Sequence, residues 1–113
     1  MLQTSTLTFL KNLKKNNNRP WFEKNKSVYL TAKEDVEHFT ERLIEGFGKK
    51  DVDIAPLQIK DCTFRIYRDV RFSKDKRPYK ANMGAYLNKG GKKMPTAGYY
   101  FHCEPGGCFV AGA

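Results

Sequence analysis

Between Arg65 and Lys80 the chain carries a lysine or arginine at every third position. The six cations of this series are Arg65, Arg68, Arg71, Lys74, Arg77 and Lys80. Arginine forks match phosphate and carboxylate groups in a bidentate geometry, and lysine adds a compact positive charge. The series therefore predicts an anion-binding site, whose ligand is either a small phosphate-bearing molecule or a nucleic acid.

Aromatic and acidic side chains are interleaved with these cations. Tyr67 and Tyr79 carry rings that can stack on a base and hydroxyl groups that can donate hydrogen bonds. An alternative interpretation is an enzyme, in which Tyr67, Asp69 or Tyr79 acts as acid or base beside the cations. A further alternative is purely structural: Asp69, Asp75 and the acidic segment 34–45 neutralise the arginines in a lattice of salt bridges, and no ligand binds.

Backbone geometry limits how the cations can be arranged. If residues 64–72 formed one strand, side chains would alternate between two faces, and Arg68 would lie on the apolar one. The other members of that face are Phe64, Ile66, Val70 and Phe72. Because an unpaired buried arginine is very costly, we expect either that the strand bends near Arg68 or that Arg68 is paired with an acid or a bound anion. The extended segment would span about 50 Å, so a turn at residues 73–78 must fold the second half back toward the first.

The hydrophobic pattern predicts an α+β fold, with a short N-terminal helix and one long helix packed on a mostly antiparallel sheet. The short helix covers residues 5–15, where leucines recur at a three-residue step. The long helix begins after Asn18, a good N-cap residue, and carries Pro20 in its first turn. Apolar residues then recur at helical spacing until Gly46 and Gly48 end the helix.

Four short segments with β-forming residues predict a sheet of about four strands. They are residues 62–67, 82–87, 98–103 and 108–111. The Glu104–Gly107 sequence EPGG predicts a tight turn between the last two strands. We expect residues 1–113 to form a single domain that is the N-terminal portion of a longer one, because the sheet stops at the last residues. An open sheet edge would also allow a homo-oligomer.

Composition narrows the class of protein. The 113 residues carry a net charge of +9, which favours anionic partners. No apolar run approaches the roughly 18 residues of a membrane span, and the N-terminus lacks the apolar core of a signal peptide. The odd number of cysteines, three, fits a reducing compartment. These features predict a cytoplasmic protein without membrane contact.

Two other motifs contain residue types found in metal or phosphate sites. Cys103 and Cys108 flank the predicted turn and, with His102, resemble half of a metal site, but the second ligand pair of a zinc site is missing. Paired thiols or a disulfide are the better interpretation. Gly90 and Gly91 precede lysines but lack the Gly-Lys-Ser/Thr ending of a phosphate loop. We therefore predict neither a metal nor a cofactor.

Three segments carry a family resemblance. They are NNNRPWFEKNK near the start, FRIYRDVRFSKDKRPYK in the middle and GYYFHCEPGG near the end. In this order they resemble the uncharacterised conserved family DUF2461, and they span most of the chain. The resemblance implies an α+β fold and members that continue beyond the end of this chain. It implies no activity, substrate, cofactor or catalytic residue, and Cys103 and Cys108 lie outside the family pattern.

Overall fold

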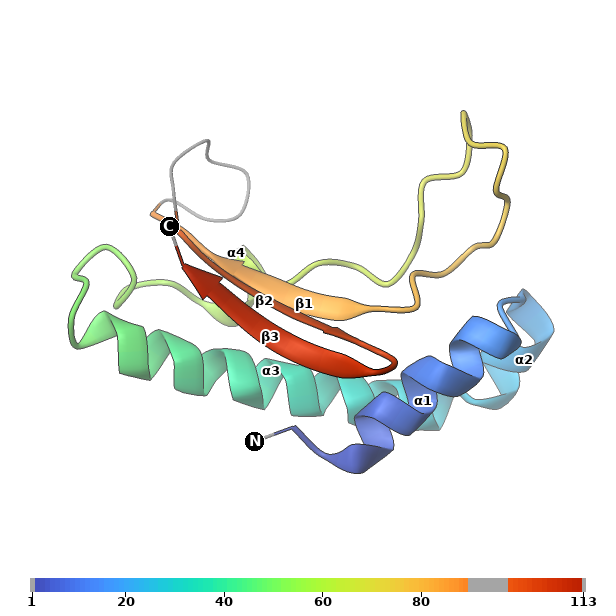
Figure 1. Ribbon diagram of the computed structural model, residues 1–113, viewed down its shortest axis with the longest axis horizontal. Coiled ribbons are helices and arrows are strands. Elements are labelled where there is room, and N and C mark those ends of the chain that lie inside the picture. Colours follow the sequence, from blue (N-terminus) through green and yellow to red (C-terminus); the bar gives the residue numbers. More distant parts are fainter. Residues whose placement is uncertain (1, 90–97, 113) are drawn as a thin grey trace.

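The computed structural model describes residues 2–89 and 98–112, and these form helices packed against one face of an antiparallel sheet (Figure 1). The helices are α1 (Thr4–Lys15), α2 (Arg19–Lys24), α3 (Lys26–Gly48) and α4 (Ile59–Cys62). The strands are β1 (Met83–Leu87), β2 (Tyr99–Glu104) and β3 (Gly107–Gly112). The predicted α+β class is confirmed, and within the described residues no helix is long and apolar enough to cross a membrane.

Asparagines divide the N-terminal half into its helices. Asn18 begins α2 as predicted, because its side-chain oxygen accepts a hydrogen bond from the Trp21 backbone N–H at 2.9 Å. The single long helix expected from Asn18 is interrupted at Asn25, so α2 and α3 are separate. The Asn25 side chain donates to the Trp21 carbonyl oxygen at 2.9 Å. This local bond competes with the helical backbone pattern, which is why asparagine favours a helix end.

The sheet has the order β1-β2-β3, with antiparallel neighbours throughout. A two-residue turn joins β2 to β3, and Gly106 adopts φ 103°, a left-handed conformation that suits glycine after Pro105. Cys103 lies directly opposite Cys108, and the two form a disulfide across the hairpin. The sequence predicted either two adjacent free thiols or a disulfide at these positions, and the structure has the disulfide.

The predicted strand at residues 62–67 is wrong. The Asp61 carboxylate accepts a hydrogen bond from the Gln58 backbone N–H at 3.1 Å, which favours a helical turn that runs to Cys62. Residues 63–67, which follow α4, belong to no described strand and make two isolated bridges, Thr63 with Ala85 and Tyr67 with Tyr79. Among the described residues the sheet therefore has three strands instead of about four.

The core lies between the helices and the inner face of the sheet. Val36 of α3 packs on Phe101 and Cys103 of β2, and a second group gathers Ile44 with buried side chains of α4 and β1. A third cluster joins α1, α2 and α3 to the segment before β1; its members are Phe9, Leu10, Leu13, Phe22, Ala32, Ile66 and Tyr79. This third cluster anchors the cationic segment to the helices.

Asn17 provides a polar link within that same contact. Its side chain donates to the Tyr79 carbonyl oxygen at 2.8 Å and accepts from the Tyr79 backbone N–H at 3.0 Å. Both hydrogen-bonding groups of the Tyr79 backbone are thereby satisfied by one side chain, although the two residues are 62 positions apart. The junction between α1 and α2 thus fixes the position of the cationic segment.

Candidate anion-binding cavity

The cationic segment folds into a hairpin-like ribbon, which arches away from the helices and the sheet (Figure 1). Tyr67 bridges Tyr79, and the Lys80 backbone N–H donates to the Ile66 carbonyl oxygen at 2.8 Å. The Arg68 backbone N–H likewise donates to the Pro78 carbonyl oxygen at 2.9 Å. The predicted turn is confirmed. Because the ribbon folds back on itself, Arg65 and Lys80 both lie at its base.

Arg68 is paired with an acid, which is one of the arrangements predicted from its apolar neighbours. Its guanidinium donates to the carbonyl oxygen of Arg77 at 2.8 Å and lies 3.3 Å from a carboxylate oxygen of Asp75. It also contacts the Asp75 carbonyl oxygen at 3.3 Å. The arginine is therefore held inside the loop at the tip of the ribbon, where it joins the two arms. Its partner is an acid of the same segment, so its charge supports the scaffold.

Two more arginines of the series are paired with acids of the same segment. Arg71 contacts Asp69 through two guanidinium nitrogens, at 3.1 and 2.9 Å. Arg77 binds Asp75 in the same way, with a closest distance of 2.6 Å. These hydrogen bonds lower the pKa of both Asp69 and Asp75 and raise the pKa of both arginines. Lys74, in contrast, is exposed and forms no ion pair with any described residue.

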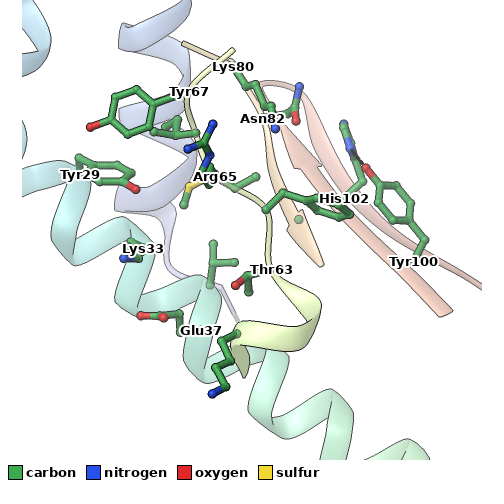
Figure 2. A pocket seen from close by; sticks show the side chains of 16 residues that line it. Tyr29, Lys33, Glu37, Thr63, Arg65, Tyr67, Lys80, Asn82, Tyr100 and His102 are labelled. Atoms are coloured by element: carbon green, nitrogen blue, oxygen red, sulfur yellow. Dashed lines mark hydrogen bonds between the residues drawn. The ribbon is translucent and has the colours of Figure 1, made fainter. Parts of the chain in front are cut away.

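An open cavity of about 840 Å³ lies at the base of the ribbon (Figure 2). Its lining comes from α3, α4, the residues on either side of the ribbon, β1 and β2. In Figure 2, Tyr29, Lys33 and Glu37 line the α3 side, Arg65 lies in the middle, and His102 and Tyr100 lie on the sheet side. The cavity thus brings together residues from distant parts of the sequence.

The cavity is electropositive. Lys33, Lys60, Arg65 and Lys80 line it against the single carboxylate of Glu37. Arg65 and Lys80 form no ion pair with a carboxylate in the part of the chain that the structure describes. Burial lowers the pKa of Lys80, and the neighbouring charge of Arg65 lowers it further. The Lys80 ammonium also lies 5.8 Å from the centre of the Phe64 ring.

The three predicted stacking or acid–base residues have different surroundings. Tyr67 lines the cavity together with Tyr29, whose pKa is raised by burial and then by Tyr67. Tyr79 is buried in the core, with its ring stacked on Phe22 at 4.1 Å. Asp69 is exposed, bound to Arg71 and not part of the cavity lining. Of these three residues, Tyr67 is the one placed to meet a ligand in this cavity.

Several cavity residues were not singled out as site residues from the sequence. Tyr29 and Lys33 are four residues apart on α3 and therefore share a helix face. Tyr100 and His102 alternate along β2 and share the outer face of the sheet. Those spacings are visible in the sequence. Their juxtaposition with Arg65 depends on the packing of the ribbon against α3 and β1, which the spacings do not specify.

The molecule is an α+β domain with a cation-lined cavity between a helix, a ribbon and a sheet. A family model of conserved hypothetical proteins, DUF2461, matches residues 5–113, so the chain belongs to this family. The family resemblance of the three sequence segments is confirmed. Searches of curated proteins and of solved structures found no match.

Proposed function

We propose that this protein binds a small phosphate-bearing ligand in the cavity at the base of the ribbon. Arg65 and Lys80 bind the phosphate, and the rings of Tyr29 and Tyr67 contact the rest of the ligand. Arginine suits this role because its fork binds two phosphate oxygens at once, while lysine adds a point charge. The other arginines of the series hold the loop together.

The proximity of Arg65 and Lys80 is the observation that carries the proposal. Two cations on one cavity wall repel each other, and the lowered pKa of Lys80 reports burial and this repulsion. A scaffold would normally relieve such repulsion with a carboxylate, as Asp75 does for Arg68 and Arg77. An anionic ligand would play that part at the cavity, and its binding would favour the charged form of Lys80.

A small ligand is favoured over a nucleic acid track. A track needs a row of cations that are available to successive phosphates. Arg68, Arg71 and Arg77 lie between the two ends of the series and are already bound to Asp69 and Asp75. The cavity offers Arg65 and Lys80 at one place instead, which matches one phosphate group.

Charge reversal at the cavity tests the proposal against a matched control. We expect Arg65→Glu to weaken binding of adenosine monophosphate about tenfold to a hundredfold, because a charge-assisted hydrogen bond is worth about 1.5–3 kcal/mol. Lys74→Glu makes a comparable reversal in the same segment but outside the cavity lining, and should change the affinity less than about twofold at 0.15 M salt, where exposed charges are screened. Isothermal titration calorimetry at pH 7.5 measures both.

Three outcomes would contradict the proposal. Equal losses in the two variants would indicate attraction by overall charge instead of a cavity. Tighter binding of a single-stranded oligonucleotide than of the mononucleotide, with equal dependence on Lys74 and Arg65, would favour the nucleic acid track. Binding that is unaffected by Arg65→Glu, in a variant with an unchanged NMR fold, would place any ligand elsewhere.

A further inference from the structure

A row of three polar side chains, Tyr100, His102 and Glu104, lies on the outer face of β2. The Tyr100 hydroxyl is 2.8 Å from Nδ1 of His102, and Nε2 of His102 is 3.6 Å from a carboxylate oxygen of Glu104. The imidazole is largely buried, with 16% of its side chain exposed. Tyr100 and His102 both line the cavity that contains Arg65 and Lys80.

The neighbouring strands hold this row in place and leave it open on one side. On β3, Phe109 stacks on the His102 ring at 5.3 Å and meets the Tyr100 ring edge-on at 6.2 Å. On β1, the residue opposite His102 is Gly84, which also lines the cavity. A Cβ atom at Gly84 would collide with the carbonyl oxygen of Phe101. Glycine is therefore required there, and no β1 side chain covers His102 at that pair.

When the imidazole of His102 is neutral, its two nitrogens determine which group donates in the hydrogen bond with Tyr100. A neutral imidazole has one N–H donor and one nitrogen acceptor. A proton on Nε2 points toward the Glu104 carboxylate, whereas a lone pair there would face the negative charge. Nδ1 is then the acceptor, so the Tyr100 hydroxyl donates its hydrogen to His102. In this state the hydroxyl hydrogen is already used and is not available to a ligand.

Protonation of His102 reverses the bond to Tyr100. Both imidazole nitrogens are then donors. Nδ1 donates to the Tyr100 oxygen, and the Nε2 proton faces the Glu104 carboxylate at 3.6 Å. The Tyr100 hydroxyl hydrogen becomes available for a different acceptor, and the wall gains one positive charge. Burial, and then the charge of Glu104, raises the pKa of Tyr100, so the hydroxyl keeps its proton through neutral pH.

We propose that Tyr100 and His102 form a second oxyanion subsite of this cavity, and that a proton on His102 activates it. This inference rests on the proposed anion binding at Arg65 and Lys80. The subsite takes another oxygen of the same phosphate-bearing ligand. Because linkage is reciprocal, the bound anion favours protonation of His102 to the same extent that protonation favours the anion.

Charged groups of both signs lie near His102. Its Nε2 is 3.6 Å from a carboxylate oxygen of Glu104, and the cavity that it lines also contains Arg65 and Lys80. On the strands that flank His102, the facing residues Gly84 and Phe109 are uncharged. Apart from His102, the charged or titratable groups of the cavity lining and of β2 are Lys33, Glu37, Lys60, Arg65, Lys80, Tyr29, Tyr67, Tyr99, Tyr100 and Glu104.

Sulfate is the probe that isolates this effect, because it keeps its charge between pH 5.5 and 7.5 whereas phosphate esters titrate near pH 6. Histidine side chains ordinarily change charge in this interval. We expect the wild-type protein to bind sulfate about fivefold or more tightly at pH 5.5 than at pH 7.5 at constant ionic strength, in line with typical coupling energies. Calorimetry or NMR titration gives the two dissociation constants.

Matched variants separate the two parts of the subsite. His102→Gln should abolish the pH dependence, while His38→Gln, which removes an exposed histidine of α3, should retain it. Tyr100→Phe should weaken sulfate binding at pH 5.5 and leave binding at pH 7.5 unchanged. Tyr86→Phe removes a hydroxyl from the facing position on β1 and should behave like the wild-type protein.

The outcomes distinguish this inference from the proposed function. If sulfate bound equally at both pH values, and Arg65→Glu abolished binding, the subsite would be overturned and the cation site would stand. If sulfate bound at neither pH, both would be overturned. If His102→Gln did not fold, the imidazole ¹⁵N shifts of the wild-type protein would decide, because saturation with sulfate must raise the protonated fraction of His102. An unchanged fraction would refute the subsite.

Discussion

Replacement of Phe22 by alanine is expected to destabilise the protein by about 3–5 kcal/mol, the usual range for a buried phenylalanine. The Phe22 side chain is 1% exposed, and its ring stacks on Tyr79 at 4.1 Å and contacts Tyr29 at 5.0 Å. The substitution would leave a cavity where α2 meets the ribbon. Urea unfolding followed by circular dichroism measures the change in the free energy of unfolding.

Phe72→Ala is the matched control for this substitution. Phe72 is 94% exposed at the tip of the ribbon, so its loss should change the free energy of unfolding by less than about 0.5 kcal/mol. Similar effects of the two substitutions would show that the ribbon is not anchored through Phe22. The cavity depends on that anchor, because Arg65 and Lys80 lie at the base of the ribbon.

Replacement of Asn17 by alanine is the second large effect, with an expected destabilisation of about 2–4 kcal/mol. The substitution removes both hydrogen bonds to the Tyr79 backbone. It leaves a donor and an acceptor unsatisfied beside the core, and each unsatisfied buried group costs about 1–3 kcal/mol. Thermal or urea unfolding measures the change, and hydrogen exchange at the Tyr79 amide reports the loss locally.

Two further substitutions define what Asn17 contributes. Asn17→Asp keeps the shape but places a carboxylate oxygen against the Tyr79 carbonyl, so it should be about as harmful as alanine. Asn16→Ala removes one exposed hydrogen bond, to the Asn12 carbonyl oxygen, and should cost about 0.5–1 kcal/mol. An Asn17→Ala variant as stable as Asn16→Ala would contradict the role of this link.

Short sequence motifs correctly predicted the helix start and the turn that depend only on neighbouring residues. Asn18 has the short polar side chain of an N-cap and does accept a bond from the Trp21 N–H. The EPGG turn also formed as expected, since Gly106 adopts the positive φ that follows Pro105. The helix end at Asn25 and the helical turn before Cys62 were not predicted. Each depends on one hydrogen bond between a side chain, Asn25 or Asp61, and the nearby backbone. The pattern of hydrophobic residues continues through both places and does not reveal these bonds.

The site was predicted in part for a similar reason. The apolar neighbours of Arg68 in the sequence predicted that it is paired, and the structure pairs it with Asp75. The even spacing of the six cations does not reveal that three of them are neutralised within the loop. The contribution of α3 and β2 to the cavity depends on long-range contacts such as Asn17 with Tyr79 and Phe22 with Tyr79. No spacing in the sequence specifies those pairs.

The titration of the Lys80 ammonium group tests the central claim most directly. NMR of ¹⁵N-labelled lysine, with and without inorganic phosphate, follows its pKa in the intact protein. We expect a pKa below the ordinary lysine value in the free protein, because of burial and Arg65, and a higher pKa when phosphate is bound. Arg65→Gln should raise the pKa of Lys80 without phosphate and reduce the effect of phosphate. A pKa of Lys80 that does not respond to phosphate would contradict an anion site at this cavity.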